Sequence, residues 1–354
     1  MARLRRSPRA SPRIFLSVVA LAAGAFSAVG CGARGSSSKR AGLVSIGAGL
    51  KGAAGLAATV YSTGVPTVSA FALDARGRLW LATSAASDHS HDAVYMVARS
   101  GARPQKVIAG VRGPLGLDWY RGRLYVTSLG RVDAFSGLRN GRFARRTTIL
   151  SEPAGHGWNN GIVHAPNGRM LMSISAACDH CTTTSRWSAT IVSFRPDGSD
   201  VRVYAKGIRA GFGLALYPGT SDLLVSMNQR DDLGARTPGD WLAQVRQGDD
   251  WRFPGCYGQG GSACAGVRKP IAVLDEHAAA GDVAVVGTAA LVAEWQSARV
   301  LRVGLTATGS TYTGVATPYV TGIRNPLALT ATRDGAVLIG DWGTGKIYRI
   351  AKRP

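Results

Sequence analysis

The sequence is poor in acidic residues and has almost no long apolar run. It holds 21 Asp and Glu against 42 Lys and Arg, which gives a formal net charge of +21. The basic residues are scattered through turn-like segments instead of being clustered, and no nucleic-acid recognition motif is present. We therefore expect no nucleic-acid partner. Such a charge favours anionic partners of another kind, such as anionic envelope polymers or anionic cofactors.

Helical patterns and aromatic residues are scarce as well. Aromatic residues make up 7% of the chain, whereas glycine is abundant at 46 residues. No segment shows the long helical periodicity that alternates with strands in a doubly wound α/β fold, which argues against that fold. With 354 residues, 45% of them hydrophobic, the chain is long enough for a large core. Many short strands joined by tight turns fit this composition better than long helices do.

The one apolar run, Ile14 to Ala28, is too short to span a bilayer comfortably. It follows a segment with five arginines and precedes small residues, as in an export signal. Ala28-Val29-Gly30-Cys31 resembles a bacterial lipobox, so we predict a lipoprotein-type signal peptide over residues 1–31, with Cys31 lipidated at the cell envelope. The alternative is an ordinary secretory signal cleaved nearby. Residues 32–60 are expected to be a flexible tether, and residues 61–354 the folded domain. Loss of the leader leaves a net charge of +16.

Cysteine is rare, and its spacing limits what it can do. Four cysteines remain beside Cys31, and an even number in an exported chain favours disulfides. Of the three pairings we expect the local one, Cys178–Cys181 and Cys256–Cys264. A zinc site would need two knuckles with metal spacing, and a separation of eight residues in the second pair does not fit.

A repeated unit of strand, turn and strand runs through most of the chain. Five segments match it: FALDARGRLWLA (71–82), LGLDWYRGRLYVT (115–127), GIVHAPNGRMLMS (161–173), LALYPGTSDLLVS (214–226) and LALTATRDGAVLIG (327–340). Repeats of roughly 45 residues made only of short strands indicate a β-propeller. We therefore predict an all-β, six-bladed β-propeller. The segment near Ala57–Tyr61 is expected to add a strand to the last blade and close the ring.

Candidate site residues stand just before the first strands of several repeats. His156 precedes the third repeat, and Gly-Ile-Arg occurs twice at equivalent positions, ending at Arg209 and Arg324. Arginine offers a planar, charged fork to a carboxylate-bearing ligand. The alternative is that these arginines support neighbouring loops through backbone carbonyls. The loop Asn228 to Gly234 is rich in oxygen ligands of the kind that bind Ca²⁺, or it is a solvated acidic loop.

Several segments together resemble the glucose/sorbosone dehydrogenase family. They are GHGWNNGIVHAPNGRM (155–170), ACDHC (177–181), residues 189–234, GDDWRFPGC (248–256) and GIRNPLALTATRDGAVLIGDWGTGKIYRI (322–350). The resemblance covers roughly residues 66–352. Members of that family are six-bladed propellers that use pyrroloquinoline quinone (PQQ). The resemblance implies oxidation of a sugar or sugar aldehyde.

The resemblance also implies roles for individual residues. His156 matches the general base, which removes a hydroxyl proton while hydride leaves the same carbon for the quinone. Arg209 matches the arginine over the quinone, where it stabilises developing negative charge. The residue after it departs from the family, because Ala210 stands where Asn and then Pro are usual.

The remaining matches concern the cofactor and its cation. Arg230, Asp231 and Asp232 match the loop that supplies oxygens to a Ca²⁺ ion. Three further residues, Asn160, Trp251 and Arg324, are expected to contact PQQ.

Two other functions remain open at this stage. One is a non-catalytic envelope propeller that binds glycans or protein partners through its mouth. The other is a metal-dependent lactonase, which ranks last because few acidic residues are placed to converge on the channel. The sequence does not identify the sugar, the electron acceptor or the oligomeric state.

The lipobox generates the first prediction. Mass spectrometry of the membrane fraction is expected to find acylated Cys31 at the mature N-terminus. An unlipidated mature N-terminus at another residue would remove the membrane anchor.

Overall fold

The computed structural model describes residues 42–85, 92–151, 157–258 and 260–353. The predicted signal peptide and His156 lie outside these ranges. The folded unit spans Leu43–Pro354 and consists almost entirely of β-strands. No helix within the described residues is long and apolar enough to cross a membrane.

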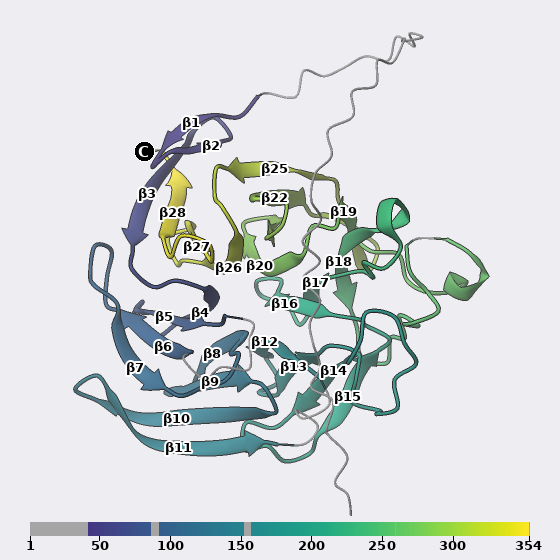
Figure 1. Cartoon of the computed structure of the whole chain (residues 1–354), viewed down its shortest axis with the longest axis horizontal. Helices are drawn as coiled ribbons and strands as arrows, with labels where there is room; N and C mark the ends of the chain where they lie inside the picture. Colours follow the sequence, from purple (N-terminus) through teal and green to yellow (C-terminus); the bar gives the residue numbers. More distant parts are fainter. Residues whose placement is uncertain (1–41, 86–91, 152–156, 259, 354) are drawn as a thin grey trace, which may run out of the picture. The chain divides into compact units, whose positions relative to one another are not determined.

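Six of the seven antiparallel sheets in the described residues are the blades of a propeller (Figure 1), and the seventh is a two-stranded hairpin. Blade 1 contains β4 (Val68–Leu73), β5 (Leu79–Thr83), β6 (Ala93–Val97) and β7 (Gln105–Ala109). Blade 2 contains β8 (Gly116–Tyr120), β9 (Arg123–Ser128), β10 (Arg131–Arg139) and β11 (Arg142–Leu150). Blade 3 contains β12 (Asn159–His164), β13 (Met170–Ile174), β14 (Thr190–Phe194) and β15 (Arg202–Lys206).

The second half of the ring carries additions to the four-stranded plan. Blade 4 contains β16 (Gly211–Leu216), β17 (Leu223–Met227), β18 (Gly239–Val245) and β19 (Ala272–Glu276), with two 3₁₀ turns in its loops, η1 (Gly234–Arg236) and η2 (Ser262–Cys264). Blade 5 contains β20 (Ala280–Val286), β21 (Ala289–Glu294), β22 (Arg299–Gly304) and β25 (Ala316–Thr321), extended by β2 (Leu50–Gly52) and β1 (Val44–Gly47). A separate hairpin consists of β23 (Thr306–Thr308) and β24 (Thr311–Thr313). Blade 6 contains β26 (Pro326–Ala331), β27 (Val337–Asp341), β28 (Ile347–Lys352) and β3 (Leu56–Ser62).

The innermost strands make a closed ring. Each of β4, β8, β12, β16, β20 and β26 contacts the next, and β26 contacts β4. The six-bladed propeller predicted from the repeat is therefore confirmed. The predicted closing strand is confirmed too, because β3 pairs antiparallel with β28 along six residues of each strand.

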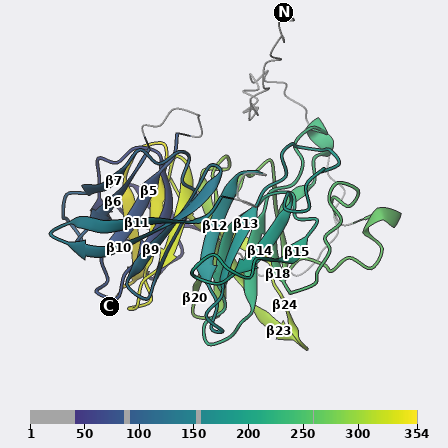
Figure 2. The ribbon, with the colours of Figure 1, turned by 90° about the horizontal axis from the view of Figure 1, so that it is seen from below.

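The antiparallel order of each blade sorts its loops onto two faces. The loops that precede the innermost strands and those that join second to third strands lie on one face, which we call the site face. The loops that join first to second and third to fourth strands start on the opposite face, the far face, although the long β18–β19 excursion also reaches the site face, where Tyr257 contacts Arg230. Figure 2 shows the blades from a second direction, with strands running between the two faces.

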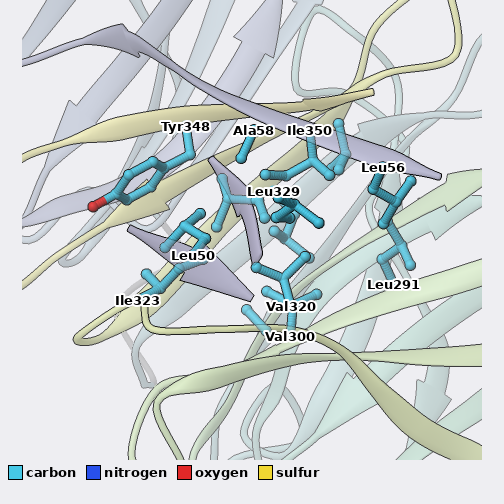
Figure 3. Close-up of a cluster of buried hydrophobic side chains, with 14 of the residues drawn as sticks. Leu50, Leu56, Ala58, Leu291, Val300, Val320, Ile323, Leu329, Tyr348 and Ile350 are labelled. Atoms are coloured by element: carbon cyan, nitrogen blue, oxygen red, sulfur yellow. The ribbon is translucent and has the colours of Figure 1, made fainter. Parts of the chain in front are cut away.

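The predicted tether ends earlier than residue 60. Residues 44–52 form β1 and β2, which add two strands to the outer edge of blade 5. The physical reason is that Ile46 and Leu50, at 3% and 1% exposure, bury apolar side chains against the propeller. In Figure 3, Leu50 lies in the cluster between blades 5 and 6 with Leu329 and Ile350. Each such fully buried aliphatic side chain contributes about 1.5–3 kcal/mol of transfer free energy.

Both predicted disulfides, Cys178–Cys181 and Cys256–Cys264, are present. The first closes a short turn in the β13–β14 loop on the site face. The second lies in the long excursion between β18 and β19, which accounts for the one oversized repeat.

A buried carboxylate joins blades 4 and 5. Asp240 is 3% exposed. Its two carboxylate oxygens accept the Gln229 N–H at 2.8 Å and the Ala280 N–H at 2.9 Å. Burial raises the pKa of Asp240 to about 7, and the two hydrogen bonds only partly offset that cost.

The raised pKa predicts a pH dependence of stability. An aspartate in the unfolded chain has a pKa of about 3.9, so between about pH 4 and 7 the folded state binds more protons than the unfolded state. The free energy of unfolding should then fall by a few kcal/mol as the pH rises through this window. Denaturant titrations of the wild type and Asp240→Asn should show a flatter pH profile in the variant. Identical slopes for the two proteins would contradict this role of Asp240.

Candidate functional site

Arg209 lies on the site face, in the loop that leads from β15 into the innermost strand β16. Its Nε–H donates to the Asp179 carbonyl oxygen at 2.9 Å, and one Nη1–H donates to the Asn228 carbonyl oxygen at 3.2 Å. Its Nη2 also pairs with the Asp179 carboxylate. Three of the five guanidinium N–H groups thus hold neighbouring loops together, and two remain for other partners. The loop-supporting role foreseen for this arginine is present in the structure.

Asp179 is the residue on which this arrangement converges. It sits between the two half-cystines of the Cys178–Cys181 turn. Besides Arg209, its carboxylate accepts the backbone N–H groups of Asp231 and Asp232, each at 3.0 Å. The disulfide turn of blade 3 is therefore tied to the acidic loop of blade 4. Sequence reasoning missed Asp179, although its place inside the CDHC motif was a usable signal.

The acidic loop that was predicted to bind a cation is internally paired. Arg230 donates to both oxygens of Asp232, each at 2.6 Å, and its guanidinium lies 4.6 Å from the ring centre of Tyr257. The hydrogen bonds from Arg230 lower the pKa of Asp232 to about 2. The neighbouring Asp231 pairs with His277 at 3.0 Å.

Both ring nitrogens of His277 are engaged by neighbouring acceptors. Its Nδ1 contacts the Asp231 carboxylate, and its Nε2 lies 3.0 Å from the Gly234 carbonyl oxygen. Both partners are acceptors, so both ring nitrogens must carry a proton. Burial lowers the pKa of His277, but the Gly234 carbonyl and the Asp231 carboxylate outweigh it and raise the pKa overall.

These side chains form a charge-balanced network across three blades. Arg209, Arg230 and protonated His277 face Asp179, Asp231 and Asp232. Among the described residues, no group of three or more His, Cys, Asp or Glu side chains is arranged to hold a metal ion. The carboxylates of Asp231 and Asp232 therefore do not fit Ca²⁺ as they stand, because each is already paired with a cation.

Two residues predicted to contact PQQ lie in the interior. Asn160 is 2% exposed, and its Nδ2 donates to Ser175 Oγ at 2.6 Å and to the Gly211 carbonyl at 3.0 Å. Trp251 is 1% exposed and packs on Trp241 with ring centres 5.1 Å apart. A cavity of about 10 Å³ borders both tryptophans, which is far too small for a tricyclic cofactor. In this arrangement neither Asn160 nor Trp251 presents its side chain to a ligand.

Arg324 differs from these residues because its side chain is exposed. It precedes β26 on the site face, and among the described residues no carboxylate lies within ion-pairing distance of its guanidinium. Its backbone N–H donates to Asp341 at 3.2 Å. Of the two matched arginines, Arg324 is thus the freer to bind an anion.

Two partly exposed tryptophans stand near Arg324 and escaped the sequence analysis. Trp295 and Trp342 meet edge to face, with ring centres 5.5 Å apart. The neighbouring Asn325 donates to the Trp295 carbonyl at 3.1 Å, and Trp342 Nε1–H donates to the Ser84 carbonyl at 2.8 Å. These bonds connect blades 5, 6 and 1, so the site face carries a fixed aromatic surface beside a free guanidinium. A further indole, that of Trp158, has a buried Nε1–H with no partner in the described chain.

Comparison with known proteins finds similarity in fold. No protein-family model matches the chain, and no curated protein is similar in sequence. The PQQ-bound aldose sugar dehydrogenase of Streptomyces coelicolor is 18% identical, over 84% of this chain and 99% of that one, with a TM-score of 0.67. The holo PQQ domain of pyranose dehydrogenase from Coprinopsis cinerea is 15% identical, over 86% and 97%, with a TM-score of 0.71. A calcium structure of a Trichoderma reesei carbohydrate-active enzyme of family AA12 is 14% identical, over 85% and 96%, with a TM-score of 0.70.

These alignments span nearly the whole length of each compared protein. The resemblance seen in the sequence motifs is therefore confirmed at the level of the fold: this chain is built on the propeller that PQQ-binding sugar dehydrogenases use.

The Asp179 network generates a prediction. Asp179→Ala removes the acceptor of two backbone N–H groups, so amide hydrogen exchange at Asp231 and Asp232 should accelerate by about tenfold or more. Asp197→Ala is a matched control, because Asp197 also accepts a backbone N–H, from Ser199 at 2.9 Å, but on the far face. Unchanged exchange at Asp231 and Asp232 in Asp179→Ala would refute the link between blades 3 and 4.

Proposed function

We propose that this chain is an exported, PQQ-dependent oxidoreductase that oxidises a sugar or a sugar aldehyde. The proposal rests mainly on the fold match to two PQQ-bound sugar dehydrogenases, which covers nearly the whole of each compared chain. It is supported by Arg209 and Arg324, which stand at equivalent positions of the repeat. Aldoses and sorbosone-type aldehydes are the proposed substrates. The electron acceptor that reoxidises the cofactor is left open.

The residues on the site face fit an anionic, planar cofactor. PQQ carries three carboxylates and, when bound, supplies a quinone that accepts the hydride from the substrate carbon. Arg324 offers an unpaired guanidinium, and Arg209 has two N–H groups left after its loop contacts. The Trp295–Trp342 pair offers an apolar surface beside Arg324 for a flat ring.

The chain's own groups would handle the proton and the charge. His156, which lies outside the described residues, is proposed to accept the substrate hydroxyl proton as general base. Neither His277, with both ring nitrogens engaged, nor the buried Asp240 competes for this role. Arg209 is proposed to stabilise negative charge that develops on the ligand. The proposal assigns no role to Ca²⁺ bound by Asp231 and Asp232, because both carboxylates are paired.

The proposed location is the cell envelope. The basic leader, the short apolar run and the lipobox-like sequence support export, with a lipid on Cys31 as the anchor. An oxidoreductase placed there would act on sugars outside the cytoplasm.

A second candidate function is binding of glycans or protein partners without catalysis. It is favoured by the internal pairing of Arg209 with Asp179, and by Ala210 where the dehydrogenases usually have Asn. A propeller whose arginine serves only its own loops would keep the fold and lose the cofactor.

The test combines cofactor binding with turnover. Purified wild-type protein is expected to bind PQQ in an absorbance titration and to oxidise sugars with an artificial acceptor. His156→Ala should leave PQQ binding nearly intact and cut turnover by roughly a hundredfold to ten-thousandfold, as for loss of a general base. Arg209→Ala should weaken both, because the guanidinium contacts the ligand in ground and transition states.

Arg142→Ala is the matched control, since it removes an exposed arginine of blade 2 that follows the β10–β11 turn on the far face. Absence of saturable PQQ binding by the wild type, with the fold intact by circular dichroism, would overturn the catalytic proposal in favour of the second function.

A further inference from the structure

A groove of about 660 Å³ lies on the far face, between blades 2 and 3. Four arginines, Arg121, Arg123, Arg169 and Arg195, line it together with Tyr120 and Tyr125. They come from the β8–β9, β12–β13 and β14–β15 turns, so the groove is on the opposite side of the propeller from Arg209 and Arg324. Its volume falls within the roughly 300–1,000 Å³ that ligand sites in proteins occupy.

The groove carries an excess of positive charge. Asp197 is the one acidic residue in its lining, so four arginines and one aspartate give the lining a net charge of +3. That carboxylate is already held by the Ser199 N–H at 2.9 Å and the Ser199 hydroxyl at 2.7 Å. Asp200, beside the lining, offsets the charge of Arg169 and Arg195, so the unmatched positive charge lies on Arg121 and Arg123 and favours an anionic ligand.

The four arginines divide into two fixed and two free. Arg169 is locked by Asp200, at 2.8 Å, and by Ser193 Oγ, at 2.6 Å. Arg195 lies 3.8 Å from the same Asp200. In the described chain, no carboxylate lies within ion-pairing distance of Arg121 or Arg123. Arg121 therefore keeps its donors for a ligand, and Arg123, which also hydrogen-bonds the Tyr125 side chain, keeps its remaining donors.

Arg121 stands on a rigid aromatic base. The Arg121 guanidinium lies 5.0 Å from the ring centre of Tyr120, and Tyr120 stacks on His164 at 4.5 Å. His164 is fixed in turn by Asp118, with Nδ1 2.8 Å from a carboxylate oxygen. A guanidinium stacked on a ring in this way leaves its N–H edge open to a planar or tetrahedral anion. On the other side, the Tyr125 hydroxyl donates to the Pro196 carbonyl at 3.1 Å and joins the two blades beneath the groove.

We propose that this groove is a second binding site, which takes a phosphate ester. A phosphate ester carries nearly two negative charges at neutral pH and accepts paired N–H bonds from arginine. The unmatched charge of Arg121 and Arg123 favours such a dianion over a single carboxylate. The phosphate group would lie between Arg121 and Arg123, with its organic part toward Arg169 and Arg195. The site is independent of the sugar-oxidising function proposed for the other face.

Isothermal titration calorimetry of the full chain tests the site with four probes. Glucose 1-phosphate, inorganic phosphate and a polyphosphate chain should all bind, and methyl glucoside should not. Binding of glucose 1-phosphate should weaken as salt is added, because it is electrostatic. Tighter binding of polyphosphate than of glucose 1-phosphate would identify a polymer as the natural source of the phosphate, and the reverse order would identify a small ester.

Two double variants locate the site. Arg121→Gln/Arg123→Gln should weaken binding of glucose 1-phosphate about tenfold or more. Arg142→Gln/Arg145→Gln removes the same charge from two exposed positions on the same blade and should leave the Kd unchanged within twofold. All four positions are exposed, so both variants should fold, which circular dichroism would check.

Three results would overturn the proposal. They are equal loss of affinity in the two double variants, no binding of any phosphate probe, and binding of glucuronate as tight as that of glucose 1-phosphate. The rate of sugar oxidation with PQQ should be the same in both double variants and in the wild type. Loss of phosphate binding and loss of sugar oxidation are therefore separate results, and each proposal can fail without the other.

Discussion

The closure of the ring is the constraint on which the rest of the structure depends. Strand β3 lies near the start of the folded unit, whereas β26, β27 and β28 lie at the end of the chain. By pairing with β28, β3 becomes the fourth strand of their blade. Within the same blade, β26 contacts β4, so that the last blade packs against the first. The apolar cluster between blades 5 and 6 draws on residues from both ends of the unit, including Leu50 and Ile350. The ring thus brings together loops that are far apart in sequence, and both proposed sites consist of such loops.

Polar contacts across blade boundaries set the geometry of the site face. Asp179 ties the disulfide turn of blade 3 to Arg209 and to the acidic loop of blade 4, while Asp240 joins that loop to β20. An unpaired buried carboxylate would be costly, and the buried Asp240 accepts two N–H groups, as does the partly exposed Asp179. The same pairing leaves the acidic loop without a free carboxylate. We therefore propose that ligand binding on this face rests on the arginines and tryptophans, together with His156.

The sequence predicted those features that follow from local patterns. Alternating strands, glycine turns and an even repeat spacing are enough to predict six blades and the closing strand. The short separations between cysteines are enough to predict both disulfides. Val44, Ile46 and Leu50 stand among glycines. Their alternation of apolar and polar residues is too short to indicate strands, so the sequence predicted a flexible tether there. Asp179, Trp295 and Trp342 were missed because their importance comes from partners on other blades. The burial of Asn160 and Trp251 likewise depends on contacts between blades, which no single repeat reveals.

The central claim is that an anionic quinone binds on the site face. Hydrogen-exchange mass spectrometry of the full chain with and without PQQ tests it most directly, because the far-face groove is a competing place for a tricarboxylate. Bound PQQ should slow exchange in the peptides that hold residues 206–211 and 321–326, with little change at residues 120–125 and 195–197. Protection confined to residues 120–125 and 195–197, or no protection at all, would contradict it.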